Sequence, residues 1–155
     1  MELTSRLVLS DLSTALEMLE VEEDMQKFRV MWIASVSLCR SVGQVLDKVD
    51  AKRSPTLGAL IKRQWQEIKS KKSENVIFHE FIEKERNLIL KEYEVGFISG
   101  KFLVTDNTSF IEELDEGLYS PIEEGFYAGE DCRDVLREAI SWWDEKLSEL
   151  ESHVH

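Results

Sequence analysis

Apolar residues recur every three or four positions along most of this chain, which is the spacing of one buried face of an α-helix. The pattern predicts helices at about 5–20, 25–49, 55–71 and 73–96, and a last helix that opens near residue 129. The stripe of the last helix is Cys132, Val135, Leu136, Ala139, Ile140, Trp143, Leu147 and Leu150. The sequence therefore predicts an all-α fold, a single-domain antiparallel bundle of about five helices over residues 1–155.

Several helix boundaries are marked by residues that favour helix starts. Asp24 is suited to cap the helix at 25–49, and Ser54 is suited to cap the next helix with Pro55 at its first position. Residues 129–131 place acids at the positive end of the last helix dipole. Glycine and proline are otherwise scarce, with seven and two in 155 residues, which favours long helices over a β-sandwich.

The helical pattern lapses over about 97–128, a long irregular connection before the last helix. Residues 97–105 have the β-branched and aromatic content of a short strand, compatible with a short strand pair, and 110–114 are compatible with a helical turn. A loop of this length in a compact domain is either functional or packed over the bundle. The aromatic residues available for such packing are Phe102, Phe110, Tyr119, Phe126 and Tyr127.

Charge is distributed unevenly along the chain, whose formal net charge is −12. Residues 1–99 contain 15 basic and 16 acidic residues, whereas residues 100–155 contain 4 and 15. Seven basic residues fall within 52–72, where Glu67 is the one acid. Acidic surface repels nucleic acid, so RNA contact is disfavoured and would have to use this basic stretch. Alternatively, the stretch is a solvated helix face, or it packs against the acidic third of this chain or of a partner.

The remaining chemistry of the sequence is sparse. Cys39 and Cys132 fall on apolar helix faces and are interpreted as buried free thiols. His79 is the only histidine outside the C-terminal end, and no phosphate-binding loop or nucleophile elbow occurs, so neither a metal site nor a cofactor is expected. The N-terminal segment is broken by charges, and no apolar run reaches the roughly 20 residues of a membrane span. These features indicate a cytoplasmic protein without membrane contact.

The helix at 73–96 carries charges where a core helix would carry leucines. At about 100° per residue, Glu85 falls almost at the centre of its apolar arc. The apolar members of that arc are Phe81, Ile82, Leu88, Ile89 and Tyr93. A carboxylate there must be paired, hydrogen-bonded or protonated, because burying it alone costs several kcal/mol. Glu85 is either half of a buried ion pair with Arg40 or Arg86, or the residue that orients Arg86 toward a phosphate.

Residues 86–93, Arg-Asn-Leu-Ile-Leu-Lys-Glu-Tyr, resemble the signature helix of the HEPN superfamily. In that motif an arginine, commonly followed by Asn, precedes a histidine by about four to six residues, often with a tyrosine shortly after. Arg86, Asn87 and Tyr93 match, whereas Lys91 stands at the histidine position. The resemblance implies a small helical bundle, a homodimer across this region, and a prokaryotic defence or toxin–antitoxin context.

Many proteins of that superfamily are metal-independent ribonucleases, in which the ribose 2′-OH attacks the adjacent phosphate. The resemblance implies phosphate binding by Arg86 and Lys91 and further catalytic candidates in Asn87 and Tyr93. Glu85, from its place in the apolar arc, would support this site by orienting Arg86. Lysine ionises near 10.4 and histidine near 6.5, so Lys91 would act as a base only with a pKa lowered by about three units. Arg86 and Lys91 also lie about 140° apart around a regular helix. They converge only on an irregular helix or across two subunits.

Three functions follow from these residues. The first is a non-catalytic HEPN-like binding or regulatory protein, because the histidine that would carry protons is missing. The second is an active ribonuclease that uses Arg86 with a partner other than histidine. The third is unrelated to nucleic acid and is an acidic interaction module, whose C-terminal third docks on a basic protein partner.

Overall fold

The computed structural model describes residues 2–105 and 111–153, and it confirms an all-α bundle with a short strand pair before the last helix. The α-helices are α1 (Thr4–Val21), α2 (Met25–Lys48), α3 (Pro55–Ser70), α4 (Glu83–Glu92) and α5 (Cys132–Ser152). Three short helical turns are η1 (Asp50–Lys52), η2 (Lys72–Glu74) and η3 (Phe78–Ile82). The antiparallel strands are β1 (Leu103–Thr105) and β2 (Ile111–Glu113).

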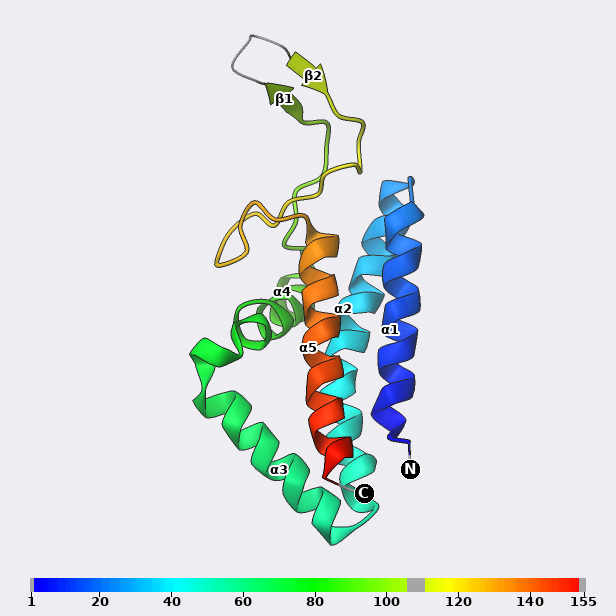
Figure 1. The fold of residues 1–155 in the computed structure, drawn as a ribbon. Coiled ribbons are helices and arrows are strands. Elements are labelled where there is room, and N and C mark those ends of the chain that lie inside the picture. The colour runs from blue at the N-terminus through cyan, green and yellow to red at the C-terminus, as the bar shows by residue number, and fades with distance from the viewer. Residues whose placement is uncertain (1, 106–110, 154–155) are drawn as a thin grey trace.

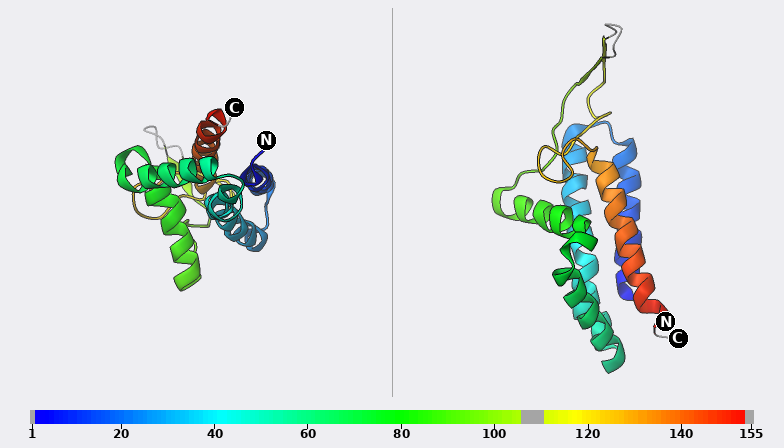
Figure 2. Two further views of the ribbon diagram at one scale, coloured as in Figure 1. Left: turned by 90° about the horizontal axis from the view of Figure 1, so that it is seen from below. Right: turned by 60° about the vertical axis from the view of Figure 1, so that its left-hand side comes forward.

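Three long helices, α1, α2 and α5, lie side by side and form the body of the molecule (Figure 1). α1 runs opposite to both of the others. α3 leaves the end of α2 at an angle, and α4 crosses the bundle near its middle (Figure 2). The strand pair projects beyond one end of the bundle, while α1 begins and α5 ends at the opposite end (Figure 1).

The core between these helices is aromatic at its centre. Trp32 of α2 and Trp143 of α5 are almost completely buried. Phe97, which follows α4, packs edge-on against both Phe28 and Trp32, with ring centroids 5.4 Å apart in each pair. The start of the segment between α4 and α5 is therefore part of the core.

Both cysteines are buried free thiols, as the apolar faces predicted. Burial raises the pKa of Cys39 to about 12, and it also raises the pKa of Cys132. Neither thiol ionises near neutral pH, so both residues are packing groups and not nucleophiles.

The predicted helix starts at Asp24, Ser54 and Asp131 are confirmed, because each side chain accepts a backbone hydrogen bond from the first turn of its helix. α1 has no such cap at its own N-terminal residue, Leu3. Its N-terminus is capped by Asp50, whose buried carboxylate accepts hydrogen bonds from the backbone N–H groups of Thr4 (2.8 Å) and Ser5 (3.0 Å).

Asp50 also holds two further groups. The Ser5 hydroxyl donates to it over 2.8 Å, and Arg53 Nε lies 3.3 Å from its other oxygen. One buried carboxylate thereby joins the start of α1 to the α2–α3 connection. A buried carboxylate is stable only when its charge and both of its oxygen atoms have partners.

The helix predicted at 73–96 is shorter and less regular than expected. Its first residues form the 3-10 turn η2, and η3 is a π-helical turn closed by a hydrogen bond from the Glu83 N–H to the Phe78 carbonyl. Regular α-helix extends only over α4. Tyr93 then ends it with a left-handed backbone (φ 52°), three residues before Gly96.

Asn75 explains the late start of this helix. Its side-chain amide donates to the Lys71 carbonyl at the end of α3 (2.9 Å), and its Oδ1 accepts from Trp142 Nε1 of α5 (3.0 Å). These tertiary bonds hold Asn75 in the connection between α3 and η3. A short polar side chain that bonds nearby backbone competes with helix formation in this way.

The segment between α4 and α5 has one part that packs on the bundle and one part that projects. Phe97 and Ile122 form a bridge at its base, and both are buried, as is Tyr127. We call residues 98–118 the arm. Its described parts are 98–105 and 111–118, and strands β1 and β2 within them project from the bundle (Figure 1).

Two expectations for this segment need correction. Packing of its aromatic residues over the bundle is confirmed for Tyr127 but wrong for Phe126, which is largely exposed. The helical turn predicted at 110–114 is wrong, since Ile111–Glu113 is strand β2. Its first residue, Phe110, lies outside the described residues.

Candidate functional site

Glu85 is buried, as its position in the apolar arc predicted, with 6% of its surface exposed. The predicted ion pair with Arg40 or Arg86 is wrong within the described residues. Glu85 Oε1 instead accepts hydrogen bonds from Trp32 Nε1 of α2 (3.1 Å) and from the Gly96 N–H (2.7 Å). This carboxylate fastens α4, and the chain that follows it, to α2.

Gly96 fits this arrangement because it has no side chain. A Cβ at this position would lie 3.2 Å from Glu85 Cδ and closer still to Oε2. Burial raises the pKa of Glu85, while the hydrogen bonds from Gly96 and Trp32 oppose that shift. A carboxylate held by two N–H donors in this way is a structural anchor of α4.

Arg86 is half-buried and lies beside Arg40 of α2. Burial, and then the Arg86 charge, lower the pKa of Arg40, whereas Glu83 opposes that shift. The Arg40 guanidinium lies over the ring of Trp65, 5.8 Å from its centroid. Two arginines are thus close together without a carboxylate in ion-pair contact with either, within the part of the chain that the structure describes.

Asn87 is half-buried, Lys91 is exposed, and 64% of the Tyr93 surface is exposed. The expectation that Tyr93 belongs to the apolar arc is wrong, because its left-handed backbone ends the helix. Arg29 of α2 donates to the Tyr93 carbonyl (2.7 Å) and lies 5.2 Å from the ring centroid.

The residues of the HEPN-like motif therefore do not converge within one chain. Arg86 and Lys91 both lie in the regular part of α4, so they remain about 140° apart around the helix. The helix irregularity that would bring them together precedes them, in η3. Arg86 lies against α2, and Lys91 and Tyr93 lie on the surface.

A cavity of 510 Å³ beside α4 is strongly acidic. Its acidic lining residues are Glu80, Glu85, Glu92, Glu94, Glu123 and Glu124. Lys84 is the one cation of this lining, and it is paired with Glu80. Such a surface repels phosphate, so it disfavours RNA on this side of α4.

The arm forms a second surface of unusual character. Leu103, Val104 and Ile111 expose 66%, 47% and 62% of their surfaces. In the strand register Leu103 lies opposite Glu113 and Thr105 lies opposite Ile111, so Leu103 and Ile111 share one face of the ribbon. Exposed acids surround these apolar residues, namely Glu112, Glu113, Asp115 and Glu116.

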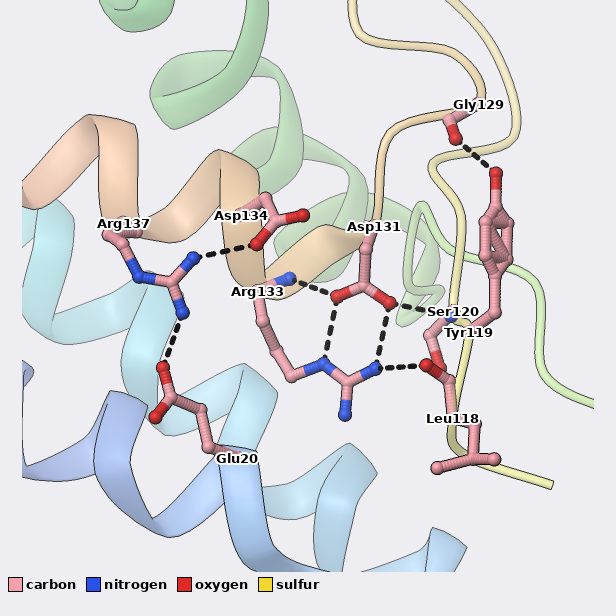
Figure 3. A network of polar contacts seen from close by, with 9 residues as sticks. All are labelled: Glu20, Leu118, Tyr119, Ser120, Gly129, Asp131, Arg133, Asp134 and Arg137. Atoms are coloured by element: carbon pink, nitrogen blue, oxygen red, sulfur yellow. Dashed lines mark hydrogen bonds and ion pairs between the residues drawn. The ribbon is translucent and has the colours of Figure 1, made fainter. Parts of the chain in front are cut away.

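The base of the arm is held firmly to the bundle by Asp131 and Arg133 (Figure 3). Arg133 pairs with Asp131 through Nη2 (2.7 Å) and Nε (2.8 Å), and Nη2 also donates to the Leu118 carbonyl (3.1 Å). The Ser120 N–H donates to Asp131 (2.9 Å), and the Tyr119 hydroxyl donates to the Gly129 carbonyl. The arm therefore leaves the bundle from a fixed base.

The pKa of Asp131 reflects this network. Burial alone would raise its pKa, but the hydrogen bonds from Arg133 and Ser120 and the Arg133 charge outweigh burial and lower it. Arg137 extends the polar contacts from α5 to Glu20 at the end of α1 (Figure 3). The arm, α1 and α5 are connected through charged groups at one end of the bundle.

Sequence reasoning identified the acidic C-terminal third but not the projecting arm. The available signal was the pairing of apolar and acidic residues in 101–116 without a helical period, which is typical of an exposed ribbon. No group of three or more His, Cys, Asp or Glu residues suited to hold a metal ion occurs within 2–105 and 111–153. Over the same residues, no helix is both long and apolar enough to cross a membrane.

Comparison of the chain with models of known protein families, with curated proteins and with solved structures gives no match. The resemblance to the HEPN superfamily therefore depends on residues 86–93 alone.

Proposed function

We propose that this protein is a non-catalytic, HEPN-like binding protein that docks a basic protein partner on its arm. The observation that carries the proposal is the combination of exposed apolar side chains and acids on a ribbon whose strands, among the described residues, make no hydrogen bond or ion pair with a helix. Scattered exposed apolar residues are ordinary, but a cluster rimmed by one sign of charge is typical of a protein interaction site.

The two components of the arm have different roles in binding. Leu103 and Ile111 supply apolar area that a partner would remove from water, at about 25 cal/mol per Å². The acids of β2 and the following turn supply attraction and selectivity for a basic surface, mainly through the association rate. A two-stranded ribbon also has free outer edges, to which an extended partner segment can add as a further strand.

The absence of catalysis in the proposal follows from the α4 residues. Lys91 is exposed to solvent, whereas a lysine that acts as a general base needs deep burial. Glu85 is occupied by Trp32 and Gly96. We infer that α4 contributes to stability and to the shape of the bundle.

The experiment reverses the charge of the arm. In the arm variant, Glu112, Glu113, Asp115 and Glu116 are replaced by Lys, and affinity capture from the native host is followed by mass spectrometry. The matched control reverses four exposed acids outside the arm whose side chains make no hydrogen bond or ion pair among the described residues: Asp11, Glu17, Glu23 and Glu145. Each captured protein is then purified, and its Kd for the three chains is measured at low and high salt.

We expect one basic partner whose binding weakens at least about tenfold in the arm variant and in high salt, because charge pairs on a basic surface are lost in both cases. The control should bind like the wild-type chain. A partner that binds the arm variant and the wild-type chain equally would contradict the proposal. So would a capture that yields no protein with these properties.

A second candidate function is a metal-independent ribonuclease that is completed across a homodimer. Arg86 favours it, because its guanidinium is not neutralised by a carboxylate within the described residues, and Lys91 and Tyr93 are accessible to a second copy. The test is cleavage of single-stranded RNA in EDTA by the wild-type chain and by Arg86→Ala. Cleavage that disappears in Arg86→Ala, with folding and dimerisation retained, would replace the first proposal by the second.

A further inference from the structure

A second cavity, of 540 Å³, lies between the C-terminal half of α2 and most of the length of α3, and Trp143 of α5 also lines it. Its floor is apolar and consists of Leu46, Ile61, Ile68 and Trp143. This volume falls within the range of about 300–1,000 Å³ that is usual for small-molecule sites. The end of α2 and the start of α3, which contribute to the lining of the cavity, lie at the opposite end of the bundle from the strand pair (Figure 1).

Gly43 is one reason that the cavity exists. A Cβ on Gly43 would lie 3.0 Å from Trp143 Cη2 and 3.3 Å from Arg40 Nη1. The indole of Trp143 and the guanidinium of Arg40 therefore meet at the wall where a larger side chain would stand. An apolar floor and a cationic group lie next to one another.

The rim of this cavity is cationic on a chain whose net charge is −12. Its charged lining residues are Arg40, Lys48, Lys62 and Asp47. Lys48 lies 3.3 Å from Asp47, so these two charges largely cancel and leave Arg40 and Lys62. Four other cavities, by contrast, have more acidic than basic residues in their linings.

Arg40 is the central group of this rim. It is half-buried, lies over Trp65 and is near Arg86, and its guanidinium makes no ion pair with a carboxylate among the described residues. A partly desolvated cation that is repelled by a neighbour gains more than a solvated one from an added anion. The surroundings of Arg40 thus favour an anionic ligand.

We propose that this cavity binds a small organic anion with an apolar body, of the class of medium-chain or aromatic carboxylates. The carboxylate lies against Arg40, with Lys62 as a more distant cation, because a guanidinium fork matches a carboxylate geometrically. The apolar body lies on Trp143, Ile61 and Ile68. Trp65 and Trp143 place two indole rings at the site, so binding is observable through their fluorescence.

The experiment titrates the full chain with sodium decanoate and follows tryptophan fluorescence and calorimetric heat. Decanol is the probe without a charge, and inorganic phosphate is the probe without an apolar body. Decanoate should bind with saturation at one site, at least about tenfold more tightly than decanol, because a charge-assisted hydrogen bond contributes about 1.5–3 kcal/mol. Phosphate alone should not compete.

Variants locate the site. Arg40→Gln should weaken decanoate binding at least about tenfold and Lys62→Gln about twofold, while Lys72→Gln, an exposed cation of η2 outside the lining, should leave it unchanged. Equal affinity of the wild-type chain for decanoate and decanol would overturn the proposal. So would unchanged binding by a folded Arg40→Gln chain. If Arg40→Gln does not fold, the comparison of the three probes on the wild-type chain decides alone.

Discussion

The bundle and the arm treat their charged residues in opposite ways. In the bundle the buried carboxylates of Asp50 and Glu85 accept three and two hydrogen bonds, all from groups at least 11 residues away in the sequence. In the arm the acids are exposed, and only Glu113 makes a contact with a cation, Lys101 at 3.5 Å, among the described residues. The buried carboxylates of the bundle hold the fold together, whereas the exposed acids of the arm contribute little to its stability and are available to a partner.

The largest effect on stability is expected at Asp50. Asp50→Ala removes the cap of α1 and leaves the Thr4 and Ser5 donors and Arg53 without their partner. The free energy of unfolding should fall by about 4 kcal/mol, because breaking a buried, hydrogen-bonded charge is costly. Urea unfolding measures this loss. If Asp50→Ala lowered the free energy of unfolding no more than a substitution in the arm does, the proposed difference between bundle and arm would be contradicted.

Glu85 should have the next largest effect. Glu85→Ala leaves the indole N–H of Trp32 and the backbone N–H of Gly96 without an acceptor, and we expect a loss of about 3 kcal/mol. Glu85→Gln keeps an acceptor at the same place and should lose clearly less. Equal losses for Ala and Gln, in the same unfolding measurement, would show that the two hydrogen bonds are unimportant.

Two carboxylates should respond to pH in opposite directions. The folded pKa of Glu85 is above its ordinary value of 4.5, so above pH 4.5 the folded chain binds more protons than the unfolded chain. The contribution of Glu85 to stability therefore falls as the pH rises from 4.5 through the folded pKa. The folded pKa of Asp131 is below its ordinary value of 3.8, so its contribution is present above 3.8 and is lost as the pH falls further.

Glu85→Gln and Asp131→Asn isolate these contributions, since other acids cancel in the difference from wild type. Between pH 7 and 4.5 the wild-type chain should gain stability relative to Glu85→Gln. Below pH 3.8 it should lose its advantage over Asp131→Asn. Parallel curves for both variants would contradict the assignment of opposite shifts.

The smallest effect on stability is expected in the arm. Leu103→Ser and Ile111→Ser change residues that are already exposed, so the free energy of unfolding should remain within about 0.5 kcal/mol of wild type. Partner binding should nevertheless weaken, because the apolar contacts would be lost. The matched control is Val21→Ser at the end of α1, another exposed apolar residue, which should change neither quantity. A large loss of stability from the arm substitutions would show that the arm belongs to the core.

The sequence was most informative where local spacing decides the structure. The helix stripes, the caps Asp24 and Ser54, and the burial of Glu85 all follow from periodicity and side-chain chemistry within a few residues. The partners of Glu85 did not follow, because Trp32 and Gly96 are brought to it only by tertiary packing. The early end of α4 depends on the left-handed backbone of Tyr93, which sequence spacing does not reveal.

The arm was predicted only in part for a related reason. Composition indicated a short strand near 97–105, but an apolar residue that packs and one that projects look alike in sequence. Phe97 and Leu103 illustrate this, since the first enters the core against Phe28 and the second remains exposed.

The most direct test of the account replaces residues 101–115 by a glycine–serine segment of equal length. This change removes the ribbon but keeps Phe97 and the Asp131–Arg133 base. We expect the free energy of unfolding to change by less than about 1 kcal/mol and binding of the basic partner found by capture to be lost. Binding that persists at wild-type affinity in the folded, arm-less chain would contradict the assignment of the arm as the interaction surface.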